Sequence, residues 1–198
     1  MSAVSIRAHG FHEGGTAMRA FNVDECRAYI EASCKATDVI IGADSERHKV
    51  RGVWHYTVTT AVIVHIDGNR GCRVFGDAYT ARDYDPRKDR PAMRLMAEVE
   101  AAAEMYLKLA DAIGERSVQI HLDINTDEVH GSSCVLHQAI GYIRGMTGIV
   151  PKVKPEAFGA SHTADRLQSI LETAAAPRAS SLKPHAWYDN NNPSSEGC

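Results

Sequence analysis

Two short segments of the chain share one pattern, in which an aliphatic run ends on an aspartate. The first, V-I-I-G-A-D, covers residues 39–44, and the second, V-Q-I-H-L-D, covers residues 118–123. Each run is flanked by turn residues, which is typical of a buried strand in a mostly parallel sheet. Because the aspartate has the same offset in both, adjacent strands would place Asp44 and Asp123 at one end of the sheet, on chains about 5 Å apart.

Three strands are predicted in the first half of the chain, over residues 38–46, 54–66 and 72–79. The second is long and β-branched, and polar turns separate it from both neighbours, around residues 48–52 and at the sequence D-G-N-R-G. Turns of this kind join antiparallel strands into hairpins. The pattern therefore predicts an antiparallel meander that precedes the longest helix.

Helical periodicity, capping residues and terminating glycines predict the remaining elements. The predicted helices cover residues 22–36, 91–113, 132–147 and 161–173, and two further strands cover residues 118–124 and 149–154. Residues 1–20 show no periodicity, so we expect a flexible arm there. Residues 174–198 are small, polar and rich in proline, which is typical of a disordered tail. The domain itself is expected over residues 21–173.

The order of elements is β-β-β-α-β-α-β-α after one N-terminal helix. Right-handed crossovers place the strand over residues 38–46 beside the strand over residues 118–124. We therefore expect an α/β fold with a mixed five-stranded sheet, in which three antiparallel strands are followed by two parallel ones, flanked by helices. This is the topology of the ribonuclease H superfamily, although a fold alone does not assign a function.

Composition narrows the class of protein without naming its activity. The 198 residues suit one domain with a full core, and 44% hydrophobic and 24% charged residues are ordinary for a globular protein. No apolar run is long enough for a membrane helix, and the N-terminus lacks the plan of a secretion signal. Five scattered cysteines without zinc spacing indicate reduced thiols and a cytoplasmic protein.

The net charge of −3 argues against a non-specific nucleic-acid coat protein, which would be basic. It leaves room for an enzyme of nucleic acid, in which carboxylates offset the basic residues that grip phosphate. Local basic clusters follow two of the predicted strands: Arg47, His48, Lys49 and Arg51, and then Arg82, Arg87, Lys88, Arg90 and Arg94. Either cluster is also compatible with an ordinary solvated loop.

The two strand-end aspartates point to a metal site. Two carboxylates this close repel each other unless a cation lies between them. Hard divalent ions such as Mg²⁺ and Mn²⁺ favour oxygen ligands. Strand alternation puts Gly42 and His121 on the same face as the aspartates, where the glycine leaves room for the imidazole to hydrogen-bond beneath them. A satisfied core histidine is the simpler interpretation of His121.

The third carboxylate has two candidates. On the long helix, Glu98 lies near the apolar stripe, whereas Glu100 and Glu104 face solvent. Only Glu98 could lean toward the aspartates, although it could also be an ordinary surface glutamate. Glu46 competes with it, because the spacing D-x-E puts Asp44 and Glu46 on one face of their strand. Proofreading-type exonucleases use that spacing, but it is a weak signal by itself.

The last predicted helix adds further candidates from the sequence K-P-E-A-F-G-A-S-H-T-A-D-R-L. Asp165 would lie on its second turn, within reach of a second metal, or could form a plain surface pair with the arginine that follows. His162 lies in the first turn and could approach the substrate or assist departure of the product. The candidates for substrate binding are Ser45, Arg47, Lys49 and Lys154.

Three blocks of the chain resemble the YkuK family, a bacterial and phage group regarded as ribonuclease H-like. The blocks are I-G-A-D-S-E-R-H-K from residue 41, H-L-D-I from residue 121, and K-P-E-A-F-G-A-S-H-T-A-D-R from residue 154. The resemblance spans roughly residues 36–172. It implies a ribonuclease H-like fold and a metal site, and it supplies no substrate.

The first hypothesis is a phosphodiesterase that uses Mg²⁺ or Mn²⁺ to cleave nucleic acid, with RNA, DNA and hybrid left open. Asp44 would bridge two metals, with Glu98 and Asp123 on one side and Asp165 on the other. The alternative is a non-catalytic nucleic-acid-binding or assembly module that retains the fold. An ATP-handling relative is disfavoured, because no glycine-rich phosphate loop follows the first strand.

Overall fold

The computed structural model describes residues 22–66, 71–85, 91–127 and 129–157. The predicted N-terminal arm, the last helix with His162 and Asp165, and the C-terminal tail lie outside these residues. Within them, no helix is long and apolar enough to cross a membrane.

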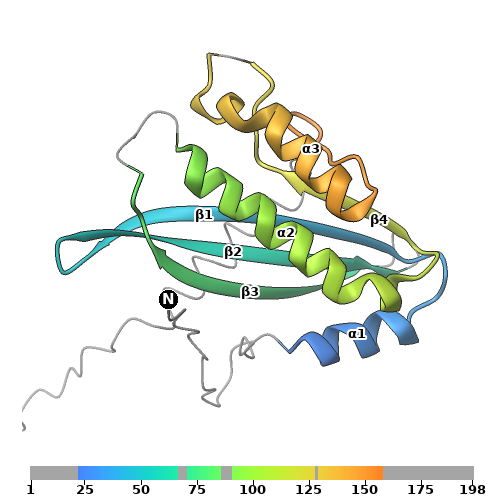
Figure 1. Ribbon diagram of the computed structural model, residues 1–198. Coiled ribbons are helices and arrows are strands. Elements are labelled where there is room, and N and C mark those ends of the chain that lie inside the picture. The colour runs from blue at the N-terminus through green and yellow to red at the C-terminus, as the bar shows by residue number, and fades with distance from the viewer. Residues whose placement is uncertain (1–21, 67–70, 86–90, 128, 158–198) are drawn as a thin grey trace, which may run out of the picture.

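The structure contains one mixed sheet of four strands in the order β3-β2-β1-β4 (Figure 1). Strand β1 pairs antiparallel with β2 and parallel with β4, and β2 pairs antiparallel with β3. The strands are β1 (Asp38–Val50), β2 (Val53–His65), β3 (Cys72–Arg82) and β4 (Ser117–Leu122). The meander and the parallel neighbour of its first strand are as the sequence predicted.

The prediction of a fifth strand over residues 149–154 is wrong. That segment forms a single parallel bridge, between Lys152 and His121. The Lys152 N–H donates to Ile120 O at 2.8 Å, but the Lys154 N–H then donates to Ile124 O and leaves the ladder register. Pro155 follows directly in a turn, and its ring restricts the preceding residue and offers no N–H. The ladder therefore stops after one bridge.

The β1–β2 hairpin is longer than predicted. Its turn consists of Arg51 and Gly52 alone, with φ angles of 49° and 82°. Two successive residues with positive φ form the kind of tight turn that matches the twist of two antiparallel strands. Pairing therefore continues out to Val50 and Val53, through residues that the sequence placed in a polar turn.

The helices lie on one face of the sheet (Figure 1). They are α1 (Val23–Ala32), α2 (Ala92–Ile113) and α3 (Leu136–Thr147), with a 3₁₀ turn η2 (Gly131–Val135) before α3. Asn22 caps α1, since its side chain accepts from the Asp24 N–H at 2.9 Å. Gly148 ends α3 in the left-handed conformation, as predicted. Helix α1 is shorter than predicted and ends at Ala32.

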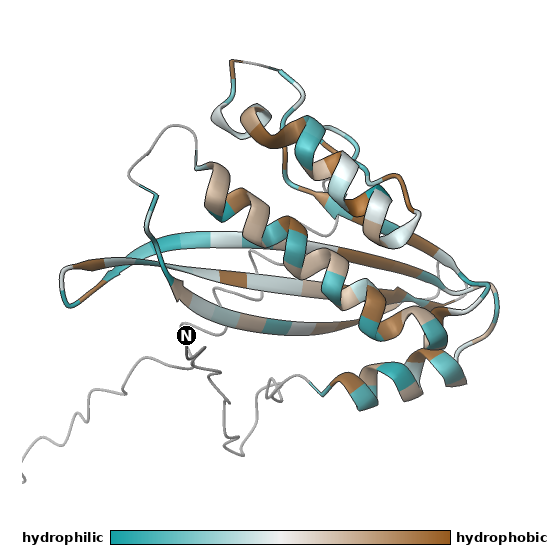
Figure 2. Ribbon diagram, in the orientation of Figure 1, coloured by the Kyte–Doolittle hydropathy of each residue, from teal (hydrophilic) through white to brown (hydrophobic). Residues whose placement is uncertain are grey.

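The core lies between α2 and the facing side of β1, β2 and β4. Alternate residues of the strands point into it, and Figure 2 shows apolar segments on the facing elements. The predicted apolar stripe of α2 is buried at Leu95, Val99, Ala102 and Ile113. The strands contribute Val39, Ile41, Val58, Val62, Val64, Ile120 and Leu122.

One arginine joins the C-terminal ends of two helices. The Arg116 guanidinium donates to Ser33 O at 2.7 Å and Glu31 O at 3.2 Å, beside the end of α1. It also donates to Ala112 O at 3.1 Å and Ile113 O at 3.3 Å, at the end of α2. Carbonyls at a helix C-terminus lack intrahelical partners and carry partial negative charge, so a cation there stabilises both helices.

We expect Arg116→Ala to lower the free energy of unfolding by about 2–3 kcal/mol, because it leaves several half-buried carbonyls without a charged donor. Thermal unfolding should then shift down by about 4–12 °C for a chain of this size. Arg144→Ala is the control, because Arg144 lies exposed in the last turn of α3. Equal melting temperatures for the two variants would contradict the role of Arg116.

Candidate functional site

The two strand-end aspartates lie on neighbouring parallel strands. The parallel ladder ends at the pair Ala43 and Leu122, and the next residue on each chain is Asp44 or Asp123. Parallel strands end at the same edge of a sheet, so the two residues leave the ladder side by side. Asp44 is half-buried, and the Asp123 side chain is 23% exposed.

A lysine already sits on one of these carboxylates. The Lys154 Nζ forms an ion pair with Asp123 Oδ1, and the Lys154 side chain is 44% exposed. The sequence placed Lys154 among the substrate-binding residues. In the structure, its ammonium balances part of the negative charge at the end of β4.

Helix α2 supplies the third carboxylate. Glu98 is 4% exposed, because it lies one turn from Leu95 and next to Val99 on the buried side of the helix. Burial raises its pKa well above the ordinary 4.5, and the charges of Asp44 and Asp123 raise it further. The Ser45 hydroxyl and Arg94 act in the opposite direction. The negative charges of both aspartates therefore raise the pKa of one buried glutamate.

The contacts of Glu98 converge on one of its oxygens. The Ser45 hydroxyl donates to Glu98 Oε1, and Arg94 Nη1 lies 3.9 Å from the same oxygen. Arg94 Nη1 also donates to Ser45 Oγ at 2.9 Å. Ser45 thus links β1 to two successive turns of α2, and the carboxyl group is held in one orientation.

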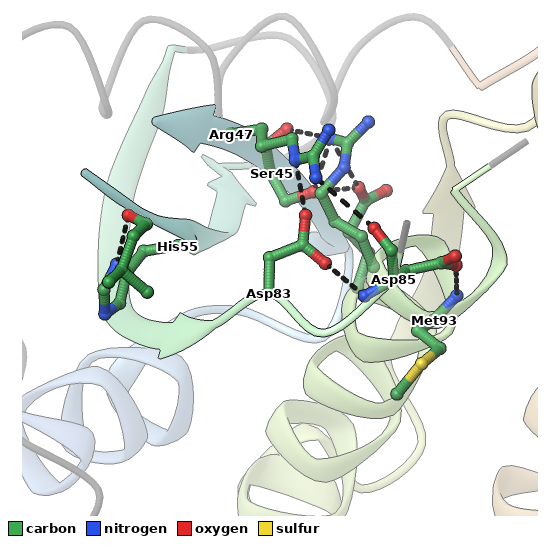
Figure 3. A network of polar contacts seen from close by, with 9 residues as sticks. Ser45, Arg47, His55, Asp83, Asp85 and Met93 are labelled. Atoms are coloured by element: carbon green, nitrogen blue, oxygen red, sulfur yellow. Dashed lines mark hydrogen bonds and ion pairs between the residues drawn. The ribbon is translucent and has the colours of Figure 1, made fainter. Parts of the chain in front are cut away.

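A second group of polar contacts fixes the start of α2 against the sheet (Figure 3). Arg47 Nε pairs with Asp83 Oδ2 at 2.5 Å, and Arg47 Nη2 donates to Asp85 O at 3.3 Å. The Asp85 N–H donates to Asp83 Oδ1 at 2.9 Å, while Asp85 Oδ2 accepts from the Met93 N–H at 3.5 Å. Pro91 provides no side-chain cap, so the buried Asp85 serves the helix N-terminus from a distance.

The predicted substrate-binding residues on β1 divide into two kinds. Ser45 and Arg47 are engaged inside the protein: Ser45 is 5% exposed, and the side chain of Arg47 is 20% exposed. Lys49 is exposed, and its Nζ lies 4.6 Å from the centroid of the Trp54 ring. The sequence did not single out Asp83 and Asp85, whose roles depend on contacts with β1 and α2 that no local spacing reveals.

The structure also separates the two candidates for the third carboxylate. Glu46 lies two residues beyond Asp44 on β1 and is exposed, whereas Glu98 is buried beside Ser45. Glu100 and Glu104 are exposed, in agreement with the helical positions read from the sequence. Glu98 is therefore the better placed of the two.

His121 lies beneath the aspartates on β4, directly beside Gly42 of β1. It is 5% exposed, and its Nε2–H donates to Gln119 Oε1 at 3.1 Å. Burial, and secondarily Lys152, lowers the pKa of the imidazole, so the neutral ring is favoured. Its Nε2 hydrogen bond goes to the neighbouring glutamine, but Nδ1 is buried without a hydrogen-bond partner in the described residues, so the histidine is only partly satisfied.

Carboxylates of β1, β4 and α2 therefore lie within electrostatic range of one another, although strand alternation puts Asp44 on the side of β1 opposite Ser45, which contacts Glu98. Within the ranges that the structure describes, no group of three or more acidic, histidine or cysteine side chains is arranged to hold a metal ion. The donor chemistry nevertheless fits a hard divalent cation, because it consists of carboxylates, two of which raise the pKa of the third, Glu98.

We expect Glu98→Gln to stabilise the metal-free protein more at about pH 8 than at about pH 4. The raised pKa means that the folded state holds its proton where the unfolded state has lost it. Stability is therefore lost as pH rises from the ordinary value through the raised one, and glutamine removes that loss. Each kcal/mol recovered should raise the melting temperature by about 2–4 °C.

The matched control is Glu100→Gln on the exposed side of the same helix. Melting curves in EDTA across this pH range measure both variants. If Glu98→Gln melts below the wild type at about pH 8, the ionised carboxylate of Glu98 does not destabilise the folded state.

Comparison with known proteins gives one family. The family model described as Ribonuclease H-like matches residues 23–169. No curated protein and no solved structure matches the chain. The narrower resemblance to the YkuK family stays a prediction. The match covers most of the chain and the whole described sheet, and it indicates a nuclease-type or nucleic-acid-related function. The protein therefore belongs to the ribonuclease H-like family.

Proposed function

We propose that the protein is a metal-dependent nuclease that hydrolyses phosphodiester bonds in nucleic acid by a two-metal mechanism. The observation that carries this proposal is the electrostatic effect of two strand-end aspartates on one buried glutamate. Asp44 and Asp123 leave neighbouring parallel strands side by side, and both raise the pKa of the buried Glu98. A fold has little reason to collect like charges in this way unless a cation shares them.

Asp44, Glu98 and Asp123 would hold Mg²⁺ or Mn²⁺, joined by Asp165 from the segment that the sequence assigns to the last helix. The metals would activate a water molecule and stabilise the departing oxygen. The ion pair of Lys154 with Asp123 supports a site that attracts cations, since the ammonium group of Lys154 already contacts this carboxylate.

The side chains around Glu98 prepare it for this role. Ser45 and Arg94 both contact Oε1, which would leave Oε2 for a cation. Arg94 also favours the charged form of a carboxyl group that burial would otherwise keep protonated. Ser45, Arg47 and Arg94 are thus positioning residues. Lys49 and Lys154 remain the candidates for phosphate contact, and His162 for release of the product.

A non-catalytic nucleic-acid-binding or assembly module is the second candidate. The same Lys154 ion pair favours it, because a lysine that neutralises Asp123 permanently would make a metal unnecessary. The two functions differ in their need for divalent metal, so metal binding and cleavage distinguish them.

We expect Asp44→Asn to lower cleavage by about a hundredfold or more, because it removes the proposed bridging ligand. Binding to nucleic acid should stay within about tenfold of wild type, since phosphate contacts come from other residues. The measurement is a cleavage panel of RNA, single- and double-stranded DNA, hybrid and junction substrates with Mg²⁺, Mn²⁺ or EDTA. Cleavage by Asp44→Asn at a rate near wild type would mean that Asp44 is not the centre of the site.

We further expect Lys154→Met to enlarge the rise in melting temperature that Mn²⁺ produces. A ligand that binds only the folded state stabilises it by mass action, and removal of a competing ammonium strengthens the attraction of Asp123 for the cation. Asp44→Asn should abolish the rise. If Mn²⁺ leaves the wild type and Lys154→Met unchanged, the non-catalytic module becomes the better assignment.

A further inference from the structure

Positive charge gathers at the free end of the β1–β2 hairpin. Lys49 lies two residues before the turn, Arg51 lies in it, and Arg82 pairs with His55 at the end of β3. All three are exposed, and none forms an ion pair within the described part of the chain. Other cations do have carboxylate partners, as in the pairs Arg27–Asp111, Lys35–Glu115 and Lys108–Glu104.

Aromatic rings hold two of these cations in place. Lys49 Nζ lies 4.6 Å from the centroid of the Trp54 ring, and Arg82 Cζ lies 5.0 Å from that of Tyr84. A cation on an aromatic face is ordered without being neutralised, in contrast to a cation beside a carboxylate. The hairpin end therefore presents charges that are both fixed and available.

The two pairs belong to opposite faces of the hairpin. Side chains alternate along a strand, so His55, opposite Arg82, points away from Trp54. His48 and His55 stack on one another with ring centroids 6.3 Å apart, whereas Arg47 and Lys49 lie over Trp54. Arg47 is also paired with Asp83, so each face carries one ordered cation without a carboxylate partner among the described residues, and Arg51 occupies the turn.

The hairpin projects beyond the rest of the sheet. Strand β4 accompanies β1 only as far as Ala43, and β3 accompanies β2 as far as the pair of His55 with Arg82, so β1 and β2 alone form the last pairs before the turn. An extended chain rises about 3.3 Å per residue, so the turn lies about 20 Å from Asp44. Figure 1 shows this end of β1 and β2 as the far tip of the sheet, and Figure 2 shows both hydrophilic and hydrophobic positions there, with Val50 and Val53 exposed beside the turn.

We infer that this hairpin end is an arm that binds double-stranded nucleic acid at a distance from the carboxylates, with one face toward each strand. A two-stranded ribbon fits the major groove of B-form DNA, which is about 12 Å wide. Lys49 contacts phosphates of one strand, Arg82 those of the other, and Arg51 lies between them. The inference rests on the proposed function and names duplex DNA as its substrate class.

The arm also sets a minimum length for the substrate. Each nucleotide of a B-form strand rises about 3.4 Å, so about six base pairs separate the arm from the carboxylates. A mononucleotide or dinucleotide could reach the carboxylates without touching the arm.

The test is fluorescence anisotropy in EDTA, with a labelled DNA duplex of about 24 base pairs and its single strand as probes across a range of salt. The variants are Lys49→Glu, Arg82→Glu and the double variant. The control is Lys35→Glu, which makes the same charge change at the opposite end of β1, where Lys35 is 88% exposed. Melting curves confirm that each variant is folded.

Each single substitution should weaken duplex binding by about tenfold, the losses should add, and the salt dependence should fall by about 0.9 per lost contact. Binding of the single strand should fall by at most about threefold, because one strand meets one face of the arm. Trp54→Leu and Tyr84→Leu should weaken duplex binding with an unchanged salt slope, since they free a cation without removing it.

Three results would overturn the proposed arm. The first is that Lys49→Glu and Arg82→Glu bind the duplex as well as Lys35→Glu does, and the second is that these variants lose equal affinity for the single strand and the duplex. The third is that the wild type binds anionic lipid vesicles and no DNA. Because the assay contains no metal, it is independent of cleavage. A wild type that binds through the arm and cleaves nothing would support the arm and contradict the nuclease.

Discussion

The burial of Glu98 beside two aspartates is the constraint on which this end of the molecule depends. A carboxylate removed from water is unfavourable, and two neighbouring negative charges make it more so. The surrounding residues respond in three ways: Ser45 donates a hydrogen bond, Arg94 brings a positive charge, and Lys154 offsets Asp123. None of these contacts removes the glutamate from the core, so its proton affinity stays high.

The same constraint explains why the start of α2 is so heavily anchored. A helix that carries a charged group into a core must be held at that position, or it would rotate the group toward water. Arg47, Asp83 and Asp85 join β1, the end of β3 and the first turn of α2. The helix begins at a proline without a side-chain cap, so the carboxylate of Asp85 takes the place of a local cap.

Features that depend on local pattern could be predicted from the sequence. The common offset of Asp44 and Asp123 gave neighbouring parallel strands, and the helical stripe of α2 singled out Glu98 from Glu100. Features that depend on distant partners could not. The role of Asp85 requires a contact across eight residues with Met93, and the engagement of Ser45 and Arg47 requires knowledge of what packs over β1. The predicted fifth strand does not form, because the prediction followed the apolar pattern and neglected the backbone restriction that Pro155 imposes.

The cations near this edge of the sheet fall into two groups with different consequences. Arg47, Arg94 and Lys154 lie against carboxylates, where their positive charge is balanced within the protein and stabilises the ionised acidic groups. Lys49 and Arg82 lie on aromatic rings, where a cation keeps its charge for an external partner. Net charge averages over both groups, which is why a chain with a net charge of −3 can still present a positive surface to a polyanion. The first group shapes the chemistry at the strand ends, and the second determines what can be brought to it.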